Sequence, residues 1–237
     1  MGKDEDPFTQ FYNEFWEFYG PQVGSLKRGH WKENKVTPSN VYACFCNSLD
    51  LLEASLILYQ HGKWPQAGAL AVLSLDEVGK AIQQIFGLIL HNRPATALSK
   101  EHETRQWLAV FPVTIEGGPS RRMGLVESRF AAVYRAGLET FRQHCLYVEI
   151  SGTGPVHEPR QVAQEDAFAV ICGTAEAIRS NVEFSRQLSA RIEAIQRNLT
   201  EMNQGYDMNR SWDKWHEMYR QRELKQSQES NEILGCL

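Results

Sequence analysis

The sequence lacks the features that mark several common classes of protein. Its five cysteines and seven histidines form no CxxC pair and no HExxH pattern, so we expect no metal site. It has no P-loop, no Rossmann glycine fingerprint and no GxSxG motif, and we therefore expect no cofactor. The HD pair of helical metal-dependent phosphohydrolases is also missing. No apolar run approaches the roughly 18 residues that cross a bilayer, which predicts no membrane partner.

The net charge and the cysteine content exclude further classes of protein. The net charge of −4 gives no bulk positive field to attract nucleic acid, so any RNA contact needs a local basic patch. The N-terminus "MGKDEDPFTQ" is acidic and polar, unlike a signal peptide. The cysteines are odd in number, and most lie in apolar helical patterns. We interpret them as reduced thiols of a cytoplasmic protein. They are Cys44, Cys46, Cys145, Cys172 and Cys236.

What the sequence does contain is helical periodicity. Few segments alternate with period two, whereas apolar residues recur at steps of three and four along most of the chain, which predicts an all-α protein. We expect a helical bundle over 37–200. An aromatic N-terminal arm with a polar connection precedes it over 1–36, and a helical tail follows over 201–237.

Caps and breaks predict the individual helices. Gly62 suits the end of the first bundle helix, and Pro65 suits the first turn of the second. The expected helices are an arm from Phe8 to Tyr19 ended by Gly20-Pro21, then Ser39 (as N-cap) to Gly62, Pro65 to Leu90, Met123 to Val148, Gln161 to beyond Arg197, and 209–226 in the tail.

The stretch "HGKWPQAGALAVLSLDEVGKA", residues 61–81, places charged side chains in a helix of small apolar residues. Glu77 shares a stripe at helical spacing with five mostly apolar residues, so we expect it on or beside the buried face. They are Leu70, Leu73, Ser74, Ala81 and Ile85. One interpretation is a surface pair between Asp76 and Lys80 with Glu77 at the rim of the core. The other makes Glu77 a buried anchor for an Arg or Asn of another helix, because a buried carboxylate needs a partner.

Two blocks resemble the AbiV family of abortive-infection proteins, within the HEPN superfamily of small helical bundles. "NSLDLLEASLILYQHGKWPQAGALAVLSLDEVGKA" looks like the first helical hairpin of that family. "FRQHCLYVEISGTGPVHEP" resembles a later helix end followed by a Gly/Pro loop, with Glu149 where the family has Asp. The resemblance spans Thr37 to Asn198 and leaves the arm and the tail outside.

The resemblance implies an antiparallel bundle that often dimerises. Many HEPN members are metal-independent ribonucleases marked by Arg, four to six residues, then His. Histidine suits acid–base work at neutral pH, and arginine stabilises the phosphorane. We therefore expect a cytoplasmic anti-phage effector that acts on RNA or translation and responds to a phage protein trigger. The alternative is a non-catalytic HEPN-like interaction or sensing module.

Two places could carry the chemistry. Arg142, His144 and Tyr147 crowd the end of the expected third bundle helix, inside the second block, and Glu77 would orient Arg142. An ordinary salt-bridged helix face with a capping histidine would give the same pattern. The runner-up site is Arg210 and His216, whose spacing fits the HEPN mark but which lie in the tail.

Overall fold

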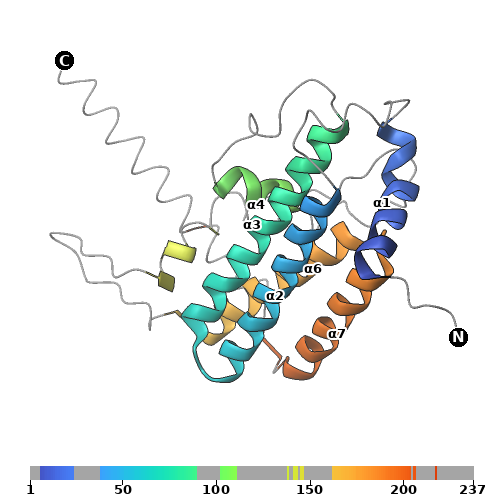
Figure 1. Ribbon diagram of the computed structural model, residues 1–237. Helices are drawn as coiled ribbons and strands as arrows, with labels where there is room; N and C mark the ends of the chain where they lie inside the picture. The colour runs from blue at the N-terminus through green and yellow to red at the C-terminus, as the bar shows by residue number, and fades with distance from the viewer. Residues whose placement is uncertain are drawn as a thin grey trace, which may run out of the picture.

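Every regular element that the computed structural model describes is an α-helix, which confirms the predicted all-α class (Figure 1). The structure describes residues 6–23, 38–89, 102–110, 138, 141–143, 145–146, 162–203, 205–206 and 217. The main helices of this part of the chain are α1 (Pro7–Val23), α2 (Pro38–Gln60), α3 (Trp64–Ile89), α4 (His102–Val110), α6 (Gln164–Val182) and α7 (Arg186–Met202).

The α2–α3 hairpin is the centre of the fold, and its turn follows the sequence signals. Gly62 has φ of 71°, the left-handed conformation that ends a helix, and Lys63 N donates to Leu58 O at 2.9 Å. Pro65 lies in the first turn of α3, where its missing N–H costs nothing. Both expectations are confirmed. Ser39 is not the N-cap, because α2 already begins at Pro38.

Small polar side chains join the two helices of the hairpin. The Ser48 and Ser74 hydroxyls lie 3.0 Å apart, and Ser74 also donates to the carbonyl of Ser48 at 2.8 Å. Nearer the turn, the Ser55 hydroxyl donates to the carbonyl of Ala67 at 2.7 Å. All three serines are buried, so these bonds satisfy groups that would otherwise be costly to bury. They also fix the register of α2 on α3.

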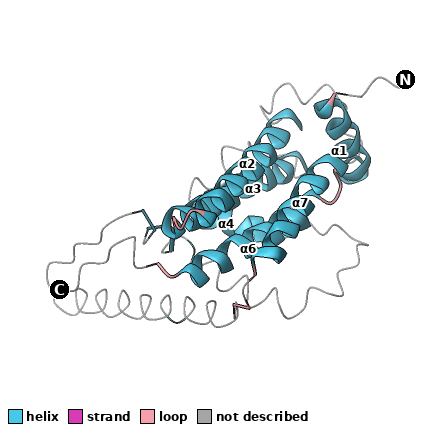
Figure 2. Cartoon of the chain, turned by 90° about the horizontal axis from the view of Figure 1, so that it is seen from below, coloured by secondary structure: helices cyan, strands magenta, loops and turns pink. Residues whose placement is uncertain are grey.

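The central helix α3 is buried on every side but one. It packs against α2, α4 and α6, and the Thr174 hydroxyl of α6 reaches the carbonyl of Ala71 at 3.3 Å. Figure 2 shows the α2–α3 pair on one side of the molecule and α6 with α7 on the other. One stripe of α3 remains partly or fully exposed, and its residues are three or four apart. The stripe consists of Gln66, Leu70, Leu73, Glu77, Lys80 and Gln84.

The expected single helix from Gln161 past Arg197 is instead two helices, α6 and α7. The chain turns at residues 183–185, which contain neither glycine nor proline. Phe184 fits into the aromatic side chains of α1, with ring centroids 5.5 Å from Phe11 and 5.3 Å from Tyr19. The break is therefore set by tertiary packing rather than by a local breaker.

The N-terminal arm completes the core of its own chain. Phe11, Phe15 and Tyr19 of α1 are buried with the residues of the bundle. The Glu14 carboxylate accepts a hydrogen bond from the backbone N–H of Arg186 at 3.0 Å and so caps the start of α7. The expected end of this helix at Gly20-Pro21 was wrong, because α1 continues to Val23. Figure 1 shows α1 beside α7.

Among the described helices, α2 is long and apolar enough by composition to cross a membrane. The expectation that no such run exists was wrong by this measure. The helix nevertheless packs along α3, with a buried row at helical spacing. Its large buried apolar residues are Val41, Phe45, Leu49, Leu52, Leu56 and Tyr59.

Two expected helices fall mostly outside the described residues. Of Met123 to Val148 the structure describes six positions, all helical: 138, 141–143, 145 and 146. Of the tail segment 209–226 it describes Glu217, which is helical.

Candidate functional site at the α3–α4 crossing

α4 crosses α3 in close backbone contact at Gly79. A Cβ atom on Gly79 would overlap the backbone of Arg105, so only glycine allows α4 to lie where it does. At its other end, α4 is anchored to α6, because the Asn181 side chain donates to the carbonyl of Ala109 at 2.8 Å. α4 is absent from the sequence-based expectation, and His102 is its first residue.

Asp76 and His102 form a carboxylate–imidazole pair at this crossing. Nδ1 of His102 contacts Oδ2 of Asp76. The Asp76 side chain is 3% exposed and that of His102 is 47% exposed, so a buried carboxylate contacts an imidazole that solvent reaches. Because Nδ1 faces the carboxylate, the second ring nitrogen, Nε2, remains for another partner. Within the part of the chain that the structure describes, Nε2 has no hydrogen bond.

Glu77, the residue expected to be the buried anchor, lies at the rim instead. Its side chain is 16% exposed and pairs with Lys80, one turn later on the open stripe of α3. The deeply buried acid is its neighbour Asp76. The interpretation of Asp76 and Lys80 as a surface pair was therefore also wrong in its partners, although it placed Glu77 correctly at the edge of the core.

Further charges gather at the same crossing. Arg105 follows His102 by one turn of α4, and its Nε is buried without a hydrogen-bond partner among the described residues. The thiol of Cys44 in α2 lies near this group. Burial raises the pKa of that thiol most, Glu77 raises it further, and Lys80 and Arg105 lower it. The net rise keeps Cys44 protonated near neutral pH, so it is not a nucleophile.

The segment that carries Arg142 packs on a different side of α3. A Cβ on Gly68 would lie 2.6 Å from Cε1 of Phe141, so this aromatic ring sits directly on α3 at that glycine. Gly68 and Glu77 are nine residues apart, which separates them by about 13.5 Å along the axis and by half a turn around it. Phe141 and Glu77 therefore lie on opposite sides of α3, and the ion pair of Glu77 is with Lys80 rather than Arg142.

The catalytic roles expected of the sequence-derived candidates stay predictions. Arg142 is half-buried in the described structure. His144, Tyr147, Arg210 and His216 lie outside the described residues. The structure adds three residues that the sequence reasoning did not select: Asp76, His102 and Arg105. Asp76 stood within the quoted motif, but α4 shows no strong apolar periodicity that would have drawn attention to its polar first turn.

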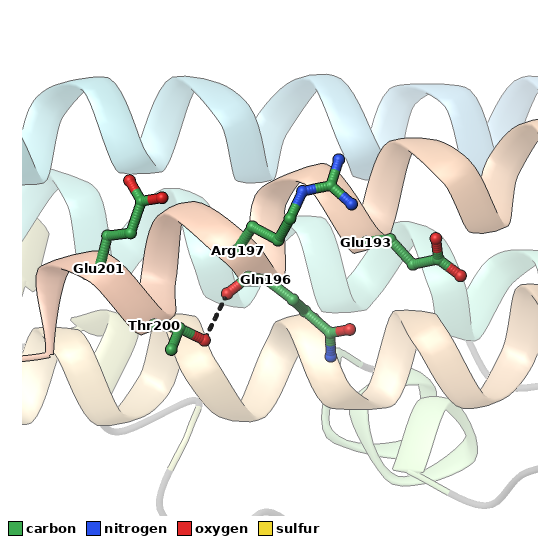
Figure 3. Close-up of a pocket in the computed structure, with 5 residues that line it drawn as sticks. All are labelled: Glu193, Gln196, Arg197, Thr200 and Glu201. Carbon is green, nitrogen blue, oxygen red and sulfur yellow. Dashed lines mark hydrogen bonds between the residues drawn. The ribbon is translucent and has the colours of Figure 1, made fainter.

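A shallow depression on α7 offers no comparable chemistry. Its described lining residues all come from one helix face, as Figure 3 shows. Thr200 donates to the carbonyl of Gln196 at 2.9 Å, an ordinary bond within the helix. The carboxylates of Glu193 and Glu201 flank Arg197 along the helix, so the charges are mixed. Elsewhere in the described residues, no three His, Cys, Asp or Glu side chains gather as metal ligands.

The other described cysteines are also unreactive by environment. Burial raises the pKa of Cys172 to about 12 and raises that of Cys145 strongly. Cys46 shows a smaller rise with the same leading cause. The described cysteines are free thiols, as the sequence predicted, and Cys236 lies outside the described residues.

Comparison with known proteins gives one positive result. The family model described as AbiV, of the HEPN type, matches residues 39–180, which is more than half of the chain. The matched range includes α2 from its second residue, α3, α4 and nearly all of α6, and leaves α1 and α7 outside. No curated protein and no solved structure matches the chain.

Proposed function

Because the chain belongs to the AbiV family of HEPN proteins, we propose that it is an abortive-infection effector that cleaves RNA, and so arrests translation, in the bacterial cytoplasm. Membership implies an abortive-infection function of the HEPN type. The observation that carries the proposal is the extent of the match, which runs from the start of α2 into the last turn of α6. It includes the complete crossing of α3 and α4 with its buried carboxylate and half-exposed imidazole.

Metal-independent cleavage fits the side chains available to this chain. Attack by a ribose 2′-hydroxyl needs a group that accepts its proton and a cation beside the phosphate, which histidine and arginine supply. The family resemblance offers Arg142, His144 and Tyr147 for these roles, with Arg210 and His216 as runners-up.

Purified full-length protein incubated with total bacterial RNA, with EDTA present, tests the proposal. We expect RNA fragments to accumulate, and the same protein expressed in a bacterial host to reduce growth and phage yield. The paired variants Arg142→Ala/His144→Ala and Arg210→Ala/His216→Ala locate the chemistry. Intact RNA at every protein concentration, with growth arrest retained, would rule out cleavage and leave another route to arrest.

A non-catalytic interaction module is the second candidate function. The observation that favours it is the position of Arg210 and His216, which carry the HEPN spacing but lie outside the matched residues 39–180. Such a module would bind RNA or a partner without changing it. A gel-shift assay that shows binding to intact RNA, with no fragments after long incubation, would favour this function over cleavage.

We also infer that the protein forms a homodimer and that a phage protein triggers it. Tyr12 and Phe18 of α1 are large, apolar and exposed, which supports an interface between copies. Light scattering of the full-length protein should give twice the monomer mass. Growth arrest that becomes stronger when a single phage gene is co-expressed would identify the trigger, and equal arrest with and without every phage gene would exclude one.

A further inference from the structure

We propose that the α3–α4 crossing is the site that acts on the RNA phosphodiester, with His102 as the proton-transfer group, Asp76 as its positioning residue and Arg105 as the phosphate-binding cation. The proposal rests on the function proposed above, because it takes RNA as the substrate. It differs from the family-derived candidates in residues and in place.

The first step concerns the direction in which the imidazole is held. Asp76 is almost fully buried and contacts Nδ1 of His102. A carboxylate in this position accepts the Nδ1–H bond, which fixes the tautomer and leaves the lone pair on Nε2. If the buried carboxylate only stabilised the fold, a lysine or an arginine could serve as its partner equally well. Here it pairs with an imidazole that is nearly half exposed, and Nε2 is the ring nitrogen that does not contact Asp76.

The second step concerns the cation beside this imidazole. Arg105 lies three residues after His102, so both side chains project from the same face of α4. Three described arginines have acidic partners: Arg179 pairs with Glu176, Arg186 with Glu14, and Arg191 with Asp50 and Glu53. Arg105 forms no ion pair with a described residue, and its Nε is buried without a hydrogen bond. Arg105 as a whole is half-buried rather than buried, so the rest of its guanidinium can take a phosphate oxygen as the acceptor.

The third step concerns how firmly the two helices are placed. Gly79 allows the backbone of Arg105 to lie directly on α3, and Asn181 fixes the far end of α4. The imidazole and the guanidinium therefore project from a helix whose position is set by backbone contact. Such placement suits a site in which a small displacement lowers the rate.

The reaction balances without any group outside the chain and water. Nε2 of His102 takes the proton from the ribose 2′-hydroxyl, and the 2′-oxygen forms a bond to phosphorus. The bond from phosphorus to the 5′-oxygen breaks, and that oxygen takes a proton from water. The hydroxide so formed takes the proton from Nε2 of His102, which returns the imidazole to its neutral form. The products are a 2′,3′-cyclic phosphate end and a 5′-hydroxyl end. Arg105 offsets the negative charge that develops on the phosphate oxygens.

His102→Asn is the sharpest test, because the asparagine amide keeps a donor toward Asp76 near the position of Nδ1 and removes Nε2. We expect RNA cleavage to fall by roughly 10²- to 10⁴-fold with little change in melting temperature. The matched control is His61→Asn. His61 is also exposed and held through Nδ1, but by the carbonyl of Ile57 at 2.7 Å, at the hairpin turn. Its cleavage rate should equal that of the wild type.

Two further variants separate the roles. Arg105→Gln should lower kcat/KM by roughly 10- to 100-fold, since a hydrogen bond from a charged donor to phosphate is lost. Asp76→Asn should lower kcat with KM unchanged, and Asp76→Glu should restore part of the rate, which a purely structural carboxylate would not do. Wild-type rates in both His102→Asn and Arg105→Gln would overturn the proposal while RNA cleavage itself stands.

If the wild-type protein leaves all RNA intact, the proposed function fails, and binding decides what remains of the site. NMR of the histidine ring resonances during titration with a 2′-deoxy oligonucleotide is the measurement. Shifts of the His102 resonances in the wild type, lost in Arg105→Gln, would retain the crossing as a phosphodiester-binding site. Unchanged His102 resonances would overturn it.

Discussion

The central helix α3 and the N-terminal helix α1 reach the same core by opposite means. α3 contacts its neighbours through residues with little or no side chain: Gly68 beneath Phe141, Gly79 beneath the backbone of Arg105, and Ser74 bonded to Ser48. α1 contacts its neighbours through large aromatic rings packed around Phe184. α3 lies within the residues matched by the family model, and α1 lies outside them.

The difference predicts opposite responses to substitution. Where helices touch through glycine, added atoms have no room, and the partner helix must move. Where they touch through aromatic rings, removed atoms leave a cavity and expose apolar surface. α3 should therefore be sensitive to gain of volume and α1 to its loss, and three substitutions measure how far this contrast extends.

The largest effect should come from Phe15→Ala in α1. Phe15 is fully buried, and its ring centroid lies 4.9 Å from that of Tyr19 and 6.0 Å from that of Phe184. We expect the free energy of unfolding in urea to fall by about 3–5 kcal/mol. Phe18→Ala, at an exposed ring stacked on the same Phe184, should cost much less. Equal effects of the two variants would show that α1 is not part of the cooperative core.

Gly79→Ala should have the next largest effect. The new Cβ would overlap the backbone of Arg105, so α4 must shift, at a cost of about 1–3 kcal/mol in unfolding free energy. Gly20→Ala in α1 is the matched control, because its Cβ would lie 3.9 Å from the nearest ring atom of Trp16. Alanine there should stabilise by up to about 1 kcal/mol through helix propensity. A stabilising Gly79→Ala would contradict the close crossing.

The smallest of the three effects should come from Glu14→Ala. The substitution removes the carboxylate that accepts the backbone N–H of Arg186, leaving an unsatisfied donor at the start of α7. We expect a loss of about 0.5–2 kcal/mol in unfolding free energy. Glu17→Ala, at an exposed position on the same helix, is the control and should be nearly neutral. Hydrogen exchange at the first amides of α7 should rise in Glu14→Ala alone.

Local signals sufficed to predict the hairpin, and long-range contacts explain the errors elsewhere. Gly62 and Pro65 act within their own turn, so the sequence located both. The corner between α6 and α7 depends on Phe184 meeting α1, some 170 residues earlier in the chain, and no local breaker announces it. The opposite case is α1, which continues through Gly20-Pro21 to Val23. Glycine and proline lower the stability of a helix but do not by themselves fix where it ends.

The sequence pointed to Glu77, whereas the carboxylate of the candidate site is that of its neighbour Asp76. Periodicity placed Leu70, Leu73 and Glu77 on one stripe, which is correct, but it joined to them Ser74, Ala81 and Ile85, which are buried. The pattern does not say which side of a nearly all-apolar helix faces solvent. The stripe of Glu77 is the open one. Asp76 differs from Glu77 by about 100° of rotation, which is enough to bring it under α4. The sequence around His102 does not predict a carboxylate partner. Its contact with Asp76 arises only because α4 crosses α3.

The order of the helices along the chain also affects how the protein is made. α3 follows α2 after a short turn, so the apolar row of α2 is covered soon after it leaves the ribosome. The partner of α3 on its other face, α6, begins at Gln164, 75 residues after the end of α3 at Ile89. At about 5–20 residues per second, the nascent hairpin waits roughly 4–15 s with that face bare. We therefore expect a ribosome-associated chaperone to protect the growing chain during this interval.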